Sequence, residues 1–224
     1  MALIELVRHA QASFGSAHYD RLSELGRQQS RWLGAYFAAR GLSFCRVVTG
    51  TLERQRDTAL EVLAAMDAAP TGSIEHPGLD EYHGERVYAA YTGGRDPYDH
   101  QRSDYRDYWR TFRAAMTAWS QDRLIGVPET WGQFGERMAD GLRAAAEGCG
   151  RDDCVLVVSS GGAISRFLAA LLGSPASVAI ELNLQYRNTG VCELRSVGDT
   201  FRVMSFNNVP HLEDPARRHA ITFA

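Results

Sequence analysis

The sequence has few of the features that mark secreted, membrane-bound or nucleic-acid-binding proteins. Only 4 of its 224 residues are cysteine. None of them forms a Cys-x-x-Cys pair or lies beside a histidine cluster, so we expect four reduced, mostly buried thiols. No apolar stretch approaches the roughly 20 residues that cross a bilayer. The net charge of −3 is far from the basic surface that nucleic acids and anionic membranes require.

The N-terminus also lacks the pattern of a secretion signal. Its apolar run at 2–7 is short, contains Glu5 and continues directly into Arg8 and His9. We therefore expect a cytoplasmic protein that binds neither membranes nor nucleic acids. No repeat or low-complexity segment occurs, and the length fits a single domain over 1–224. The frequency of dimers among soluble proteins makes a homodimer the default expectation.

Alternating apolar runs and helical patterns predict an α/β fold. Short apolar runs rich in β-branched residues predict strands, whereas apolar residues at helical spacing predict helices. The predicted strands are 2–7, 46–49, 154–158 and a late hairpin of 191–194 with 201–206. The predicted helices are 22–40, 52–66, 98–122, 130–147 and 163–172. The region 71–97 reads as loop-rich. This order predicts a three-layer α/β/α sandwich with a mostly parallel central sheet and a helical cap inserted at about 85–130.

Polar residues follow three of the predicted strands. Arg8 and His9 follow the first, Arg54 lies just beyond the second, and the small residues at 159–162 follow the strand at 154–158. Ligands of parallel sheets bind beyond the carboxyl ends of the strands, so these residues should meet at one edge. Guanidinium groups and the amides of a helix N-terminus both favour phosphate. A histidine among them is a candidate nucleophile or acid–base group.

Six short blocks, in order along nearly the whole chain, resemble the histidine phosphatase (phosphoglycerate mutase-like) superfamily. Leu6-Val7-Arg8-His9 resembles its Arg-His-Gly signature. Leu52-Glu53-Arg54, with Thr58-Ala59 shortly after it, resembles its second arginine block, and Leu79-Asp80-Glu81 resembles the block with its proton donor. The other matching blocks are 19–29, 157–162 and 207–212.

The resemblance implies a metal-independent phosphatase that needs no cofactor, because arginines supply the positive charge. His9 would accept the phosphoryl group of a phosphomonoester and pass it to water, and Glu81 would donate and then accept the proton. The implied phosphate-binding residues are Arg8, Arg54, Ser160 and Gly161. The substrate would be a phosphorylated small molecule or a phosphoprotein. His211, in the last block, is expected to be a structural histidine.

The chain departs from the family pattern at Ser160, where the family has its second catalytic histidine. A lost charge-assisted hydrogen bond of this kind is worth roughly 2–4 kcal/mol. Three alternatives remain open: the enzyme works with Ser160, another residue such as His83 fills the gap, or the protein binds phosphorylated ligands with little turnover. A phosphoglycerate mutase is a further alternative, but the divergent site and the nearly balanced charge of 85–127 favour a phosphatase. The aromatic residues of that segment would pack in a core or line a pocket for an organic group.

Overall fold

The computed structural model describes residues 1–13, 20–67, 73–95 and 105–223. Segment 96–104 of the expected cap therefore lies outside the described residues. The strands are β1 (Leu3–Arg8), β2 (Arg46–Thr49), β3 (Ile74–Glu75), β4 (Cys154–Ser159), β5 (Val191–Val197) and β6 (Thr200–Val203). The α-helices are α1 (Glu24–Ala39), α2 (Glu53–Ala65), α3 (Gly84–Thr92), α4 (Tyr105–Ser120), α5 (Trp131–Ala146), α6 (Gly161–Leu171) and α7 (Ala176–Leu184).

The strands form one sheet in the order β3-β2-β4-β1-β5-β6. The pairs β3/β2, β2/β4 and β4/β1 are parallel, whereas β1/β5 and β5/β6 are antiparallel. The first four strands in this order therefore direct their carboxyl ends to the same edge. The predicted α/β fold with a mostly parallel sheet is confirmed.

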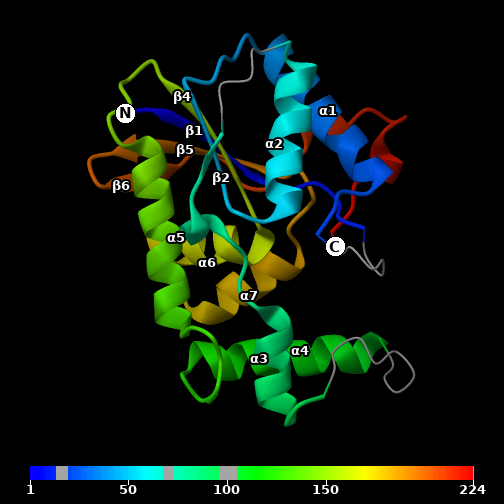
Figure 1. The fold of residues 1–224 in the computed structure, drawn as a ribbon, viewed down its shortest axis with the longest axis vertical. Helices are drawn as coiled ribbons and strands as arrows, with labels where there is room; N and C mark the ends of the chain where they lie inside the picture. The colour runs from blue at the N-terminus through cyan, green and yellow to red at the C-terminus, as the bar shows by residue number, and fades with distance from the viewer. Residues whose placement is uncertain (14–19, 68–72, 96–104, 224) are drawn as a thin grey trace.

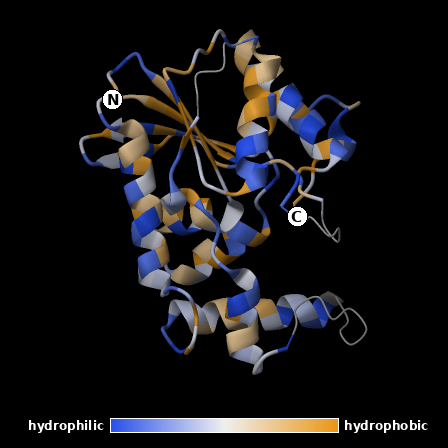
Figure 2. Ribbon diagram, viewed as in Figure 1, coloured by the Kyte–Doolittle hydropathy of each residue, from blue (hydrophilic) through white to orange (hydrophobic). Residues whose placement is uncertain are grey.

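Helices cover both faces of the sheet, with α1 and α2 on one face and α5, α6 and α7 on the other (Figure 1). Both faces of β4 are buried because alternate side chains join different cores. Val155 and Val157 pack in the core that contains α5 and α6, whereas Leu156 and Val158 pack with α1 and α2. The central strands are accordingly among the most hydrophobic segments, and the covering helices are polar on their outer faces (Figure 2).

Helices α3 and α4 lie beyond the end of the sheet, at the far end of the molecule in Figure 1. The later part of α4 joins them to the main core. Trp119 packs against Trp131 and Phe134 of α5, with ring centroids 5.1 and 5.5 Å apart, and its indole N–H donates to the Glu129 carbonyl. Within the described residues, no helix is both long enough and apolar enough to span a membrane.

Two helices were missing from the sequence-based prediction. The loop-rich reading of 71–97 is wrong over α3, a nine-residue helix that ends at Gly93 with a φ of 72°. Contacts beyond its own sequence hold it, since Val87 and Tyr88 are buried and the Tyr88 ring stacks on Tyr108 of α4 at 5.7 Å. Helix α7 begins directly after Pro175, and its apolar residues do not gather on one face, so its periodicity was weak.

Candidate active site

The carboxyl edge of the parallel strands gathers the residues that the sequence singled out. Arg8 ends β1 and His9 follows it, Arg54 lies in the first turn of α2 just after β2, and Gly161 begins α6 just after β4. The His9 amide donates to the Ser159 carbonyl at 2.9 Å, which joins the ends of β1 and β4. The convergence follows from the parallel pairing of these strands.

The surroundings of His9 select one tautomer of its ring. Nδ1 lies 2.8 Å from the Ala10 carbonyl oxygen, so this nitrogen carries the proton. Nε2 accepts a hydrogen bond from Nε of Arg54 at 3.1 Å, so its lone pair is directed at the guanidinium. Burial, with the positive charges of Arg54 and Arg8, lowers the pKa of His9 well below its usual value. His9 is therefore neutral at physiological pH, with Nε2 as its basic nitrogen.

The two arginines beside His9 are held by different partners. Arg54 forms an ion pair of 2.6 Å with Asp20, and this partner was not singled out as functional from the sequence, although it lies in the matching block 19–29. Arg8 donates to the backbone carbonyl oxygens of Tyr186 and Phe223. Because other contacts already hold these guanidinium groups in place, they lose little conformational entropy when they bind an anion.

Glu81 follows the short 3₁₀ helix Pro77–Leu79 and reaches the N-terminus of α6. Its carboxylate accepts hydrogen bonds from the amides of Gly162 at 2.9 Å and Tyr82 at 3.2 Å. Burial raises the pKa of Glu81, against the lowering effect of these amides and of Arg54 and Arg8. A carboxyl group with a raised pKa suits proton donation near neutral pH. The helix N-terminus that we expected to bind phosphate thus holds a carboxylate at one of its amides.

Ser160 is not in the position expected of a phosphate-binding residue. Its side chain is fully buried, and its hydroxyl accepts a hydrogen bond of 2.9 Å from Nε2 of Gln55. The same amide group also donates to the Leu79 carbonyl at 3.1 Å. Ser160 does not line the cavity that contains His9. Gly161 lies closer to the site. A Cβ added to Gly161 would lie 3.3 Å from Nε of Arg8.

A cavity of about 1110 Å³ connects these residues to α3 and α4. Arg8, His9, Arg54 and Glu81 line one end of it. The side chains that line it from α3 and α4 are mostly aromatic or basic: Arg86, Tyr88, Arg106, Tyr108, Trp109, Arg110, Phe112 and Arg113. Both expected roles of the aromatic residues of the cap are therefore present. These residues stack on one another, as in a core, and they also border the cavity, as in a pocket for an organic group.

The remaining histidines of interest lie in different environments. His83 lines the cavity at the start of α3. His211 is buried, and its Nε2 lies 2.8 Å from the Thr189 hydroxyl. Burial and the charge of Arg217 lower the pKa of His211 to about 3. His211 is not among the residues that line the cavity, which agrees with a structural role.

Sequence reasoning also missed Asn188 and Asn183, which lie near the site. The Asn188 amide donates to the His9 carbonyl at 3.2 Å, and the Asn183 amide donates to the Tyr82 hydroxyl at 3.3 Å. Both asparagines line the cavity. No motif marks them, because each reaches the site from the segment around the end of α7, which is distant in the sequence from β1.

No curated protein sequence matches the chain. Among solved structures, a mutant phosphoserine phosphatase from Entamoeba histolytica in complex with phosphoserine superposes with a TM-score of 0.67 at 15% identity, covering 95% of this chain and 100% of that one. Bacillus stearothermophilus YhfR gives 0.68 at 19% identity, with the same coverage of 95% and 100%.

A third similar structure is the mycobacterial glucosyl-3-phosphoglycerate phosphatase, with a TM-score of 0.63, 21% identity, and coverage of 92% of this chain and 98% of that one. At these identities the likeness establishes a shared fold. The family model of the histidine phosphatase superfamily (branch 1) matches residues 4–209, nearly the whole chain. The chain therefore belongs to the histidine phosphatase superfamily.

Proposed function

We propose that this protein is a metal-independent phosphatase that hydrolyses phosphomonoesters through a phosphohistidine at His9. The observation that carries the proposal is the state of the His9 ring. It is neutral, its Nδ1 proton is held by the Ala10 carbonyl, and its unprotonated Nε2 lies beside Arg54, whose hydrogen bond would pass to a phosphoryl oxygen when substrate binds. A neutral imidazole fixed in one tautomer beside two guanidinium groups is suited to nucleophilic attack on a phosphoryl group.

In the first step, Nε2 of His9 would attack phosphorus in line with the ester oxygen. The P–N bond forms while the P–O ester bond breaks, and the leaving oxygen takes the proton of Glu81. Arg8 and Arg54 would offset the negative charge of the transferring group. Phosphate recognition would rest on guanidinium groups, because the chain contains no lysine.

In the second step, water would cleave the phosphoenzyme. The Glu81 carboxylate, now deprotonated, accepts a proton from the water as its oxygen bonds to phosphorus. The P–N bond breaks, and its electron pair returns to Nε2 of His9. Inorganic phosphate leaves, and both residues regain their initial protonation states.

The size of the cavity supports a substrate larger than phosphate itself. Pockets of ~300–1,000 Å³ usually hold organic molecules, and this one has a volume of about 1110 Å³. The segment at 85–130 would act as a cap, and its aromatic and arginine side chains would bind the organic part of the ester. We propose a phosphorylated small molecule or a phosphorylated side chain of a protein as substrate.

The position of Ser160 favours one second candidate, a module that binds phosphorylated ligands with little turnover. Its hydroxyl faces Gln55 and not the cavity, so it does not replace the donor that the family's second histidine would supply. Among the described residues, His83 is the other histidine that lines the cavity and is a candidate for that role.

The test is the hydrolysis of an aryl phosphate in the presence of chelator, with trapping of an acid-labile phosphoenzyme. Wild type should turn over and be labelled, whereas His9→Ala should do neither. His219→Ala is the matched control, because His219 is exposed and does not line the cavity. If wild type binds phosphate in a His9-dependent way without turnover, the binding module is correct. Phosphoserine and glucosyl-3-phosphoglycerate, named in two structural neighbours, belong in the substrate panel.

A further inference from the structure

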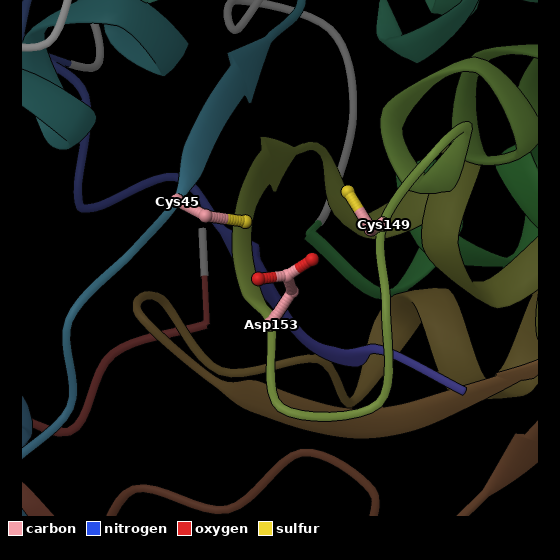
Figure 3. A group of neighbouring side chains, drawn as sticks. All are labelled: Cys45, Cys149 and Asp153. Carbon is pink, nitrogen blue, oxygen red and sulfur yellow. The ribbon is translucent and has the colours of Figure 1, made fainter.

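Two thiols and a carboxylate converge at the edge of the sheet opposite the candidate active site. Cys45 directly precedes β2, Asp153 directly precedes β4, and Cys149 lies just past the end of α5. The two sulfur atoms and a carboxylate oxygen of Asp153 all lie within 4.8 Å of one another. Figure 3 shows Cys45 at the start of one segment, facing Cys149 and Asp153 at the two ends of the turn that joins α5 to β4.

The backbone around this cluster is tied together. The Cys45 amide donates to the Cys154 carbonyl at 2.9 Å, which fixes the start of β2 beside the start of β4. The Gly150 amide donates to Oδ2 of Asp153 at 2.6 Å and closes the turn between them. Arg46 donates to carbonyl oxygens at the end of α5, the nearer ones at 2.8 and 2.9 Å. The three donor side chains therefore start from positions that other contacts have already set.

The proposed phosphatase makes no use of these residues. They lie at the amino ends of β2 and β4, whereas His9 and Arg54 lie beyond the carboxyl ends. None of the three lines the 1110 Å³ cavity. Cys45 is exposed and Cys149 is partly exposed, so an ion in solution can reach the sulfur atoms. All four cysteines of the chain belong to the described residues, and they are present as free thiols.

We infer that Cys45, Cys149 and Asp153 form a binding site for one Zn²⁺ ion. Two thiolates and a carboxylate are a donor set that selects thiophilic metal ions over Mg²⁺ or Ca²⁺. Zn–S bonds of about 2.3 Å in a tetrahedron place two sulfur atoms roughly 3.8 Å apart. The donors therefore need to move inward by about 1 Å or less, and water fills the fourth position. Each thiol gives its proton to solvent as its Zn–S bond forms, so no oxidation or reduction is involved.

The charge of the complex is also compatible with this location. Two thiolates and one carboxylate carry three negative charges, and Zn²⁺ offsets two of them. Arg46, adjacent to Cys45 in the sequence, supplies a further positive charge. The site would link β2, β4 and α5, and its expected effect is stabilisation of the fold, not participation in phosphoryl transfer.

The test uses the full chain, freed of metal and kept reduced with a phosphine. Zn²⁺ is titrated in competition with a chromogenic chelator, and Cd²⁺ is titrated while thiolate-to-metal charge-transfer absorption is recorded. Wild type should bind one equivalent of either ion. Cys45→Ser and Cys149→Ser should each weaken binding by about 100-fold, and Asp153→Asn by about tenfold. Asp152→Asn, the adjacent acid outside the cluster, is the matched control and should bind like wild type.

A folding control separates loss of the site from loss of the protein. Circular dichroism of each metal-free variant should match wild type, and the thermal melt of metal-free Cys45→Ser should match it as well, because Cys45 is exposed and serine there removes no core packing. Zn²⁺ should raise the melting temperature of wild type and Asp152→Asn equally, and that of the three ligand variants by less at the same Zn²⁺ concentration. The inference is overturned if reduced wild type takes up no stoichiometric metal, or if both serine variants bind it equally well. A Cys45–Cys149 disulfide formed on oxidation, without metal uptake by the reduced protein, would also overturn it.

Discussion

Replacing Gly162 by alanine perturbs the Glu81 carboxyl without touching its own atoms. A Cβ at Gly162 would lie 2.4 Å from Oε1 of Glu81 and 2.5 Å from Cε1 of Tyr82. Both separations are shorter than any normal contact, so the carboxyl or the ring must move. The Gly162 amide also donates to Oε2 of Glu81, so a displaced carboxyl loses this hydrogen bond as well.

These contacts determine how much the substitution should lower the unfolding free energy and kcat. Overpacking costs about 1–3 kcal/mol of unfolding free energy, and alanine recovers about 0.5–1 kcal/mol as a better helix former than glycine. The net destabilisation should therefore lie between about 0 and 2.5 kcal/mol, which leaves the protein folded. If Glu81 is the proton donor, kcat should fall by about 10² to 10³, within the range that a positioned acid contributes.

The assay compares an alkyl phosphate with an activated aryl phosphate. An alkoxide needs the proton of Glu81 when it leaves, whereas an activated phenolate does not, so Gly162→Ala should slow phosphoenzyme formation from the alkyl ester far more. Single-turnover labelling measures this step apart from hydrolysis of the phosphoenzyme, which is common to both esters. Gly132→Ala is the control, because a Cβ at that helical glycine has its nearest neighbour at 3.7 Å. Equal slowing of phosphoenzyme formation from both esters, or a rate for the alkyl ester within about twofold of wild type, would refute the assignment of Glu81 as proton donor.

Three further substitutions test other parts of the molecule. Arg54→Lys should lower kcat/KM by about 10² to 10³ while the protein stays folded, because one ammonium cannot at once donate to His9, pair with Asp20 and bind the phosphoryl group of the proposed substrate. A change of less than fivefold in steady-state kinetics would count against this prediction. Burial and a neighbouring glutamate raise the pKa of Glu5 from 4.5 to about 7. The folded state therefore holds this proton more tightly than the unfolded state, and wild type should lose at most about 3 kcal/mol of stability between pH 4.5 and 7. In urea unfolding at pH 5 and pH 8, the unfolding free energy of Glu5→Gln should not show that loss. If the unfolding free energies of wild type and Glu5→Gln change equally between the two pH values, the raised pKa of Glu5 is contradicted. Ser160→Ala should cost about 1 kcal/mol, because the Gln55 amide loses an acceptor, with KM changed by less than about threefold; a large rise in KM would instead place its hydroxyl on the phosphate.

The sequence was sufficient for the layered fold because its signals are local. The continuous apolar run of β4 and the alternation of strands with helices specify a parallel sheet buried on both faces. The edge where Arg8, His9 and Arg54 meet follows directly, since parallel strands end together. Glu81 was added by resemblance to a family, because a carboxyl in a polar loop has no local pattern that marks it.

Other features depend on contacts between distant segments. Helix α3 is only nine residues long and is bordered by Gly84 and Gly93, and it is stabilised by the burial of Val87 and Tyr88 and by the stacking of Tyr88 on Tyr108 of α4. The sequence placed Ser160 at the edge of the sheet, but packing decided that its hydroxyl faces Gln55 and not the cavity.

The sequence by itself determined most of the strands and helices, how they alternate and which residues end the parallel strands, because periodicity and composition act within a few residues. Only the tertiary structure decided where side chains point and which distant residues meet. The hydrogen bond from Arg54 to Nε2 of His9 joins two elements, and the approach of Cys45 to Cys149 depends on how α5 ends beside β2. Both are set by the packing of whole elements, which no local sequence pattern encodes.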